Sequence, residues 1–162
     1  GLPIGLQFMA PAMADDRLYA SVIADLQHLP PEMLQVMVRA KGAKRIILVS
    51  DSVLLTGMKP GHYTMFGADV EMKRGGRVCL AGTDLLAGSS LILPEAVMNM
   101  ASVTEMTLAR ALASASRLPA RLMGVRMPSW PPRPGRPAEF VLYAPGAEGS
   151  GLRKKPLLVF TG

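Results

Sequence analysis

The clearest pattern of apolar and polar positions spans residues 18–51 and predicts a strand, a helix and a second strand. Residues 18–25 are mostly apolar or β-branched, and residues 45–51 form an almost continuous apolar run. Between these runs, apolar residues recur at helical spacing: Met33, Leu34, Met37 and Val38. Pro31 suits the first helical turn, and Gly42 suits the helix stop. This order is typical of a βαβ unit with parallel strands.

The pattern changes in residues 61–82, where short strand-like segments are broken by glycines. The Gly-Gly pair of "RGGR" predicts a hairpin turn, so we interpret this stretch as a β-hairpin excursion from the main domain. Helical spacing returns in residues 93–103 and 104–124, and Thr104 is the expected N-cap of the second helical stretch. The positions of that stretch expected to face a core are Leu108, Leu112 and Ala115.

The last part of the chain is rich in proline and then becomes strand-like. Residues 125–137 contain five prolines and predict a linker, in which Trp130 is the expected packing anchor. Residues 138–144 and 156–162 are apolar runs that predict two strands joined by a Gly-rich turn. The fold class expected from the whole pattern is α/β.

Composition and charge narrow the class of protein. The 162 residues are 49% hydrophobic, which supports one packed core, and no apolar run reaches the roughly 18 residues of a membrane helix. The net charge is +6, but basic residues are scattered without interleaved aromatics, so neither nucleic acid nor a membrane is an expected partner. The single cysteine, Cys79, cannot form an internal disulfide, and we interpret it as a core thiol in a cytoplasmic protein.

The candidate chemistry lies where the two apolar runs end. Asp51 closes the second run and is followed by a loop that ends in glycine. Such an aspartate is commonly a turn-capping residue. A catalytic role is the less common alternative. The residues alone leave both interpretations open.

Four segments carry a resemblance to a known family. In chain order they are "IADLQHLPPEMLQVMVRAKG", "RIILVSDSVLLTG", "LAGSSLILPEAV" and "ALASASRLPARLMG". Together they resemble the C-terminal half of N-acetylglucosamine-6-phosphate deacetylases, of the amidohydrolase superfamily. The resemblance implies a partial (β/α)8 TIM barrel made of its last βα units, with a β-hairpin insertion and the C-terminal strands of a small β-sandwich domain. It divides the chain into a divergent N-terminal segment (1–13), a barrel part (14–124) and a linker with β-domain strands (125–162).

The resemblance also implies a reaction and roles for particular residues. The reaction is metal-dependent hydrolysis of an N-acetyl amide to glucosamine-6-phosphate and acetate. Asp51 matches the catalytic aspartate, which takes a proton from a metal-bound water and delivers it to the leaving amine. The substrate-binding residues that it implies are Asp25, Leu26, Gln27 and His28 in one segment and Leu86, Ala87 and Gly88 in another. Within the first segment, Leu26 stands where many members have glycine.

The metal ligands of the family have no match in this sequence. Full-length members hold a divalent metal, of the zinc or iron type, with a glutamate and two histidines from the earlier half of the barrel, whereas this chain has two histidines in total. We therefore expect a C-terminal portion without metal residues, inactive alone, of a homodimeric enzyme that binds an amino-sugar phosphate. Two alternatives stay open: an amidohydrolase acting on a different amide, and a non-catalytic truncated fragment.

Overall fold

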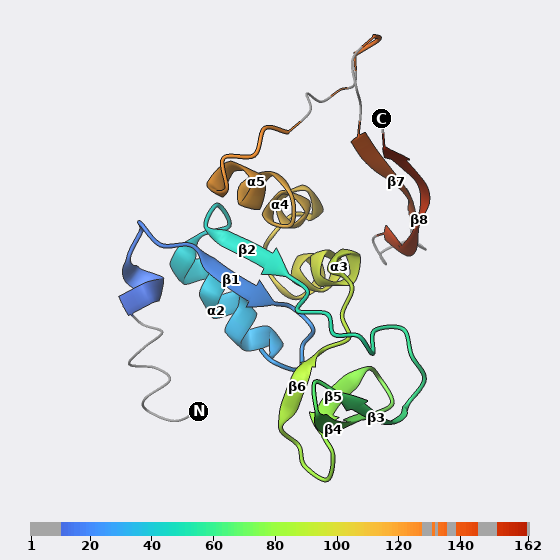
Figure 1. Ribbon diagram of the computed structural model, residues 1–162. Coiled ribbons are helices and arrows are strands. Elements are labelled where there is room, and N and C mark those ends of the chain that lie inside the picture. The colour runs from blue at the N-terminus through green and yellow to red at the C-terminus, as the bar shows by residue number, and fades with distance from the viewer. Residues whose placement is uncertain (1–10, 128–130, 132, 136–138, 146–151, 162) are drawn as a thin grey trace.

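The computed structural model describes residues 11–127, 131, 133–135, 139–145 and 152–161 (Figure 1). Its first regular unit runs from β1 (Ala20–Ile23) through α2 (Pro31–Lys41) to β2 (Ile46–Val49). The two strands pair in parallel, in a register that sets Ala20 opposite Ile46. The predicted βαβ unit is confirmed, and both strands are shorter than the apolar runs from which they were predicted.

The main hydrophobic core lies on one face of the β1–β2 pair. Ala20, Val22, Ile46 and Leu48 share this face because side chains alternate along a strand. Buried residues of α2, of α3 (Leu93–Val103) and of α4 (Leu108–Ser114) belong to the same core cluster. The helices therefore cover one face of the parallel pair.

Helix α2 follows its sequence signals closely. Pro31 occupies the first turn, and Gly42 ends the helix with a φ of 74°, in the left-handed region that glycine adopts without steric cost. The buried apolar residues on its inner face are Leu34, Met37 and Val38, at the predicted spacing. These residues anchor the segment that follows β1.

The predicted start of the next helical stretch was wrong. Thr104 does not begin a helix: it ends α3, and its hydroxyl donates to the carbonyl of Met100 at 2.7 Å. Thr107 is the N-cap of α4, and its side chain accepts from the backbone N–H of Arg110 at 3.3 Å. Leu112 is 40% exposed, so the expectation that it faces the core was also wrong, whereas Ala111 is fully buried.

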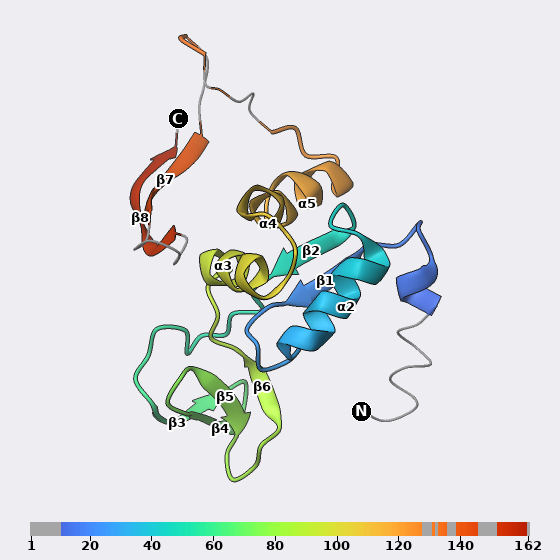
Figure 2. The same cartoon turned by 180° about the vertical axis from the view of Figure 1, so that it is seen from behind.

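A separate antiparallel sheet follows β2. Its strands are β3 (Gly61–Met65), β4 (Ala68–Met72), β5 (Arg77–Leu80) and β6 (Leu86–Ser89), paired in that order. The hairpin predicted at "RGGR" connects β4 to β5 and is confirmed, but β6 makes the sheet larger than a hairpin. The sheet has its own small hydrophobic core. Cys79 of β5 is fully buried, whereas His62 of β3 is exposed. Figures 1 and 2 show this sheet beyond the carboxyl ends of β1 and β2.

The remaining described elements follow α4 in the sequence. Helix α5 (Arg117–Leu122) follows α4, and β7 (Glu139–Pro145) pairs antiparallel with β8 (Leu152–Thr161), so the two predicted terminal strands are confirmed. The expected packing role of Trp130 falls outside the described residues. In the described part of the chain, no helix is both long and apolar enough to cross a membrane.

A buried lysine ties the start of the described chain to α2. Lys41 is only 2% exposed, and its ammonium donates to the backbone carbonyls of Ala12 and Asp15. These bonds give the buried ammonium of Lys41 hydrogen-bond acceptors, and they hold the segment that leads into β1.

Candidate functional site

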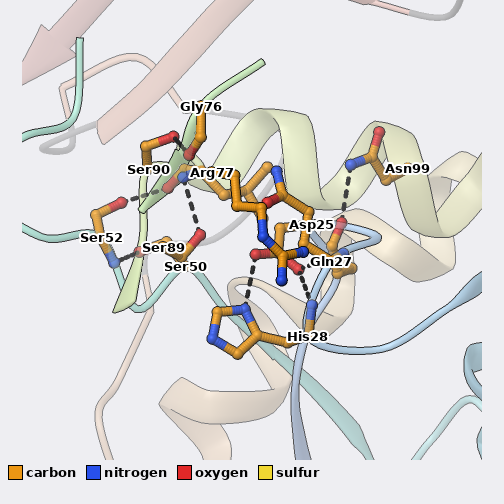
Figure 3. Close-up of polar contacts among 12 residues, drawn as sticks. Asp25, Gln27, His28, Ser50, Ser52, Gly76, Arg77, Ser89, Ser90 and Asn99 are labelled. Carbon is orange, nitrogen blue, oxygen red and sulfur yellow. Dashed lines mark hydrogen bonds and ion pairs between the residues drawn. The ribbon is translucent and has the colours of Figure 1, made fainter. Parts of the chain in front are cut away.

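The loop after β1 is built around the carboxylate of Asp25. Its Oδ1 accepts hydrogen bonds from the backbone N–H groups of Gln27 at 3.0 Å and His28 at 2.9 Å. Its Oδ2 lies 2.7 Å from Nδ1 of His28 (Figure 3). Leu26, between them, has a φ of 62°, in the left-handed region where a leucine side chain is strained. Leu26 therefore occupies a backbone conformation that favours glycine.

Asp25 is held as a carboxylate. Burial raises the pKa of Asp25, but hydrogen bonds from the backbone N–H groups of His28 and Gln27, together with the His28 side chain, lower it below its usual value overall. The ionised carboxylate fixes Nδ1 of the His28 ring as the nitrogen that carries a proton toward Asp25. The other ring nitrogen, Nε2, has no hydrogen bond to another described residue.

A side chain from α3 supports this loop from outside it. Asn99 donates from Nδ2 to the carbonyl of Ala24 at 2.8 Å, immediately before Asp25 (Figure 3). The two residues are 75 positions apart, so no local pattern in the sequence points to their contact. Asn99 is the supporting residue that reading the sequence missed.

Asp51 leaves the carboxyl end of β2 in a left-handed turn. Its φ is 52°, a conformation that aspartate tolerates better than most residues. The residue is exposed, and within the described part of the chain its carboxylate has no hydrogen bond or ion pair. Because β1 and β2 are parallel, the Asp25 loop and Asp51 lie at the same end of the pair.

The segment Leu86–Ser89 runs directly beside Asp51. The N–H of Ser89 donates to the carbonyl of Asp51 at 3.2 Å, and the N–H of Val53 donates to the carbonyl of Ser89 at 2.9 Å. Gly88 has a φ of 103°, and a Cβ placed there would lie 2.3 Å from Cγ1 of Val53. Glycine is therefore required for this close approach. Ala87 instead packs against the core of the four-stranded sheet.

A cavity of about 270 Å³ opens between the Asp25 loop, the four-stranded sheet and α3. Gln27 contributes to its lining, and Oε1 of Gln27 is a buried acceptor without a hydrogen bond among the described residues. Its Nε2 donates to the carbonyl of Gly75 at 3.5 Å. Neither Asp51 nor His28 is among the described residues that line the cavity, so it adjoins these two residues rather than containing them.

The described residues do not by themselves fit a metal centre. Across the described ranges, no three His, Cys, Asp or Glu side chains come together as a ligand group. The Asp25 carboxylate is already occupied by its own loop. No metal ligand is therefore assigned within this part of the chain.

Comparisons with known proteins identify relatives of this chain. No family model matches the chain. A putative N-acetylgalactosamine-6-phosphate deacetylase of Escherichia coli K12 is 34% identical over 147 residues, which are 88% of this chain and 86% of that protein. The N-acetylgalactosamine-6-phosphate deacetylase of Escherichia coli O157:H7 is also 34% identical over 147 residues, but these cover only 38% of its length.

Solved structures of deacetylases are also similar to this chain. The N-acetylglucosamine-6-phosphate deacetylase of Thermotoga maritima superposes with a TM-score of 0.66 at 29% identity, over 70% of this chain and 31% of that one. A variant of the Mycobacterium smegmatis enzyme, solved with N-acetyl-D-glucosamine-6-phosphate, gives 0.62 at 26% identity, over the same shares.

A mixed α/β chain with these structural neighbours has the fold of an amidohydrolase. The chain belongs to the N-acetylglucosamine- and N-acetylgalactosamine-6-phosphate deacetylase family. The resemblance found in its sequence is thereby confirmed, and the chain spans about a third of the solved relatives.

Proposed function

We propose that this chain supplies the catalytic aspartate and the sugar-binding loop for hydrolysis of the N-acetyl amide of an amino-sugar 6-phosphate. The observation that carries the proposal is the meeting of three separate segments at one end of the parallel pair. The Asp25 loop follows β1, Asp51 follows β2, and Gly88 lies on the strand bonded to Asp51.

The proposed role of Asp51 is to move a proton during amide cleavage. An exposed carboxylate without a described partner is free to accept a proton from an attacking water. Asp51 would then return that proton to the departing nitrogen, which leaves as an amine. Its left-handed backbone directs the chain out of β2 and leaves the carboxylate at the strand end.

His28 and Gln27 are proposed to orient the substrate. With Nδ1 of His28 donating to the Asp25 carboxylate, Nε2 is left as the acceptor of the ring and can take a hydrogen bond from a hydroxyl or N–H group of the substrate. The free Oε1 of Gln27 offers an acceptor to a hydroxyl or N–H of the sugar. The backbone of residues 86–88 would approach the substrate beside Asp51.

The wider architecture follows from the same site. We propose that β1 and β2 are neighbouring strands of a (β/α)8 barrel, with residues 14–124 in the barrel part and residues 125–162 in the β-domain part. Supporting this, the strands are parallel, the helices pack on one face, and polar residues cluster at the carboxyl ends.

A chimera tests the activity. Residues 14–162 would replace the aligned segment of the Escherichia coli O157:H7 relative, and acetate release from N-acetylglucosamine 6-phosphate and N-acetylgalactosamine 6-phosphate would be measured. We expect Asp51→Asn to reduce turnover by about 10²–10⁴-fold. The matched control Asp69→Asn, at an exposed aspartate of β4, should retain the activity of the chimera. Equal turnover in the two variants would refute the role of Asp51.

Binding can be tested on the 162-residue chain itself. In an NMR titration with N-acetylglucosamine 6-phosphate, we expect amide shifts in residues 25–28, 51–53 and 86–89. Shifts confined to other regions would contradict the proposed binding site.

A further inference from the structure

A second cavity lies at the other end of β2 from Asp51. It is an open hollow with a volume of about 470 Å³, bordered by the turn before β2, by α4 and by α5. Its lining contains four cationic side chains: Lys44, Arg110, Arg117 and Arg121. Figures 1 and 2 both show α5 beside the start of β2, on the side away from the four-stranded sheet.

The four cations have no acidic partner in the described part of the chain. None of the described residues that line the cavity is acidic, and none of the four cations takes part in an ion pair there. Some basic side chains elsewhere are paired, as in Lys73–Asp84 at 2.9 Å and Arg45–Asp16 at 3.2 Å. This cavity instead gathers in one place four cations without such a pair among the described residues.

The helices bring the positive charges together rather than separating them. Arg117 and Arg121 are four residues apart in α5, where like charges repel across one helical turn. Arg110 adds a third guanidinium from α4, and Ser114, one turn later, is buried in the lining. An anion held between these groups would remove the repulsion.

We propose that this cavity binds a compact, phosphate-bearing small molecule. The planar guanidinium donates pairs of hydrogen bonds that match phosphate oxygens, and three arginines line this cavity. The volume lies in the usual range of small-molecule sites. A single-stranded nucleic acid is a poorer match, because the described residues of the lining include no aromatic side chain on which a base could stack.

The cavity is separate from the proposed catalytic site. Lys44 precedes β2 and Asp51 follows it, and seven residues of extended chain span roughly 20 Å. A substrate held at Asp51 and Gln27 therefore does not reach the four cations. The cavity would bind its own ligand, at the end of the strands opposite the chemistry.

The test is an NMR titration of the ¹⁵N-labelled 162-residue chain with pyrophosphate at low salt. We expect saturable shifts in the amides of Lys44, Ser114 and Arg117, with a dissociation constant below about 1 mM. Arg117→Gln together with Arg121→Gln should weaken binding by about tenfold or more. The matched pair Arg74→Gln with Arg126→Gln removes the same charge from exposed sites outside the cavity and should weaken it less than about twofold.

Three results would overturn the proposal: no saturable shift, shifts centred on residues 25–28, or equal weakening by the two double variants. Equal weakening by the two double variants would mean that pyrophosphate is attracted by the net positive charge of the chain and not by this cavity. Arg110→Gln provides a second variant on a different helix, with an expected weakening of about threefold or more. Wild-type affinity in Arg110→Gln would also count against the site.

Discussion

Replacing Gly88 by alanine is the sharpest test of how the site is held. The backbone there has a φ of 103°, and the added Cβ would lie 2.3 Å from Cγ1 of Val53 and 3.9 Å from the carbonyl oxygen of Asp51. Two carbon atoms that are not bonded to each other do not approach to 2.3 Å, so either Val53 or strand β6 must move. A movement of the backbone of Val53 or β6 disturbs the hydrogen bonds that join Ser89 to Asp51 and Val53.

The expected cost has two parts. Forcing a residue with a Cβ into a positive φ costs about 1–2 kcal/mol, and overpacking against Val53 costs about 1–3 kcal/mol. Gly88→Ala should therefore lower the free energy of unfolding by about 2–5 kcal/mol, a large share of the roughly 5–15 kcal/mol of an ordinary domain. Urea denaturation followed by circular dichroism measures this loss.

Gly82→Ala separates the two parts. Gly82 also has a positive φ, 73°, but a Cβ there would meet nothing within 4 Å, so it should lose only the backbone part of about 1–2 kcal/mol. A double-mutant cycle with Val53→Ala then measures the steric coupling directly, because that change removes the clashing methyl group. Equal destabilisation by Gly88→Ala and Gly82→Ala would refute the close approach of β6 to the end of β2.

Three further substitutions test other features by urea or thermal denaturation. Asp25→Asn should lower stability by about 1–3 kcal/mol at pH 7. Since folding lowers the pKa of Asp25, this difference should shrink as the pH falls below about 4, and a constant difference would contradict the hydrogen-bonded carboxylate. Leu26→Gly should stabilise the fold by about 0.5–1 kcal/mol because it relieves a positive φ, whereas Val36→Gly at an exposed site in α2 should destabilise it by a similar amount. Lys41→Met should cost about 1.5–3 kcal/mol because the bonds to two backbone carbonyls are lost, and an unchanged unfolding midpoint would show that they contribute nothing.

The elements with strong local patterns could be predicted from the sequence. Leu34, Met37 and Val38 repeat at helical spacing, and the apolar run of β2 has few other structures open to it. The Asp25 loop is also local, since a side chain that accepts from N–H groups two and three residues ahead is fixed by short spacing.

Features that depend on distant contacts could not be predicted in this way. Thr104 and Thr107 are equally suited to cap a helix, and where α3 ends decides between them. The bond from Asn99 to Ala24 and the pairing of Ser89 with Asp51 join segments with no shared pattern in the sequence. The identity of Gly88 signals an unusual backbone, but only the fold shows that Val53 is the neighbour that requires it.

The bridge between Ser89 and the end of β2 also makes the position of Asp51 independent of the loop that follows it. The aspartate is anchored by hydrogen bonds to a strand almost forty residues later, not by the length of the intervening path. Extra residues inserted after the exposed Gly57 would lengthen that path at a small entropic cost, about 0.6 kcal/mol per doubling of loop length. The Asp51 end of β2 can thus stay in register while this connection varies in size.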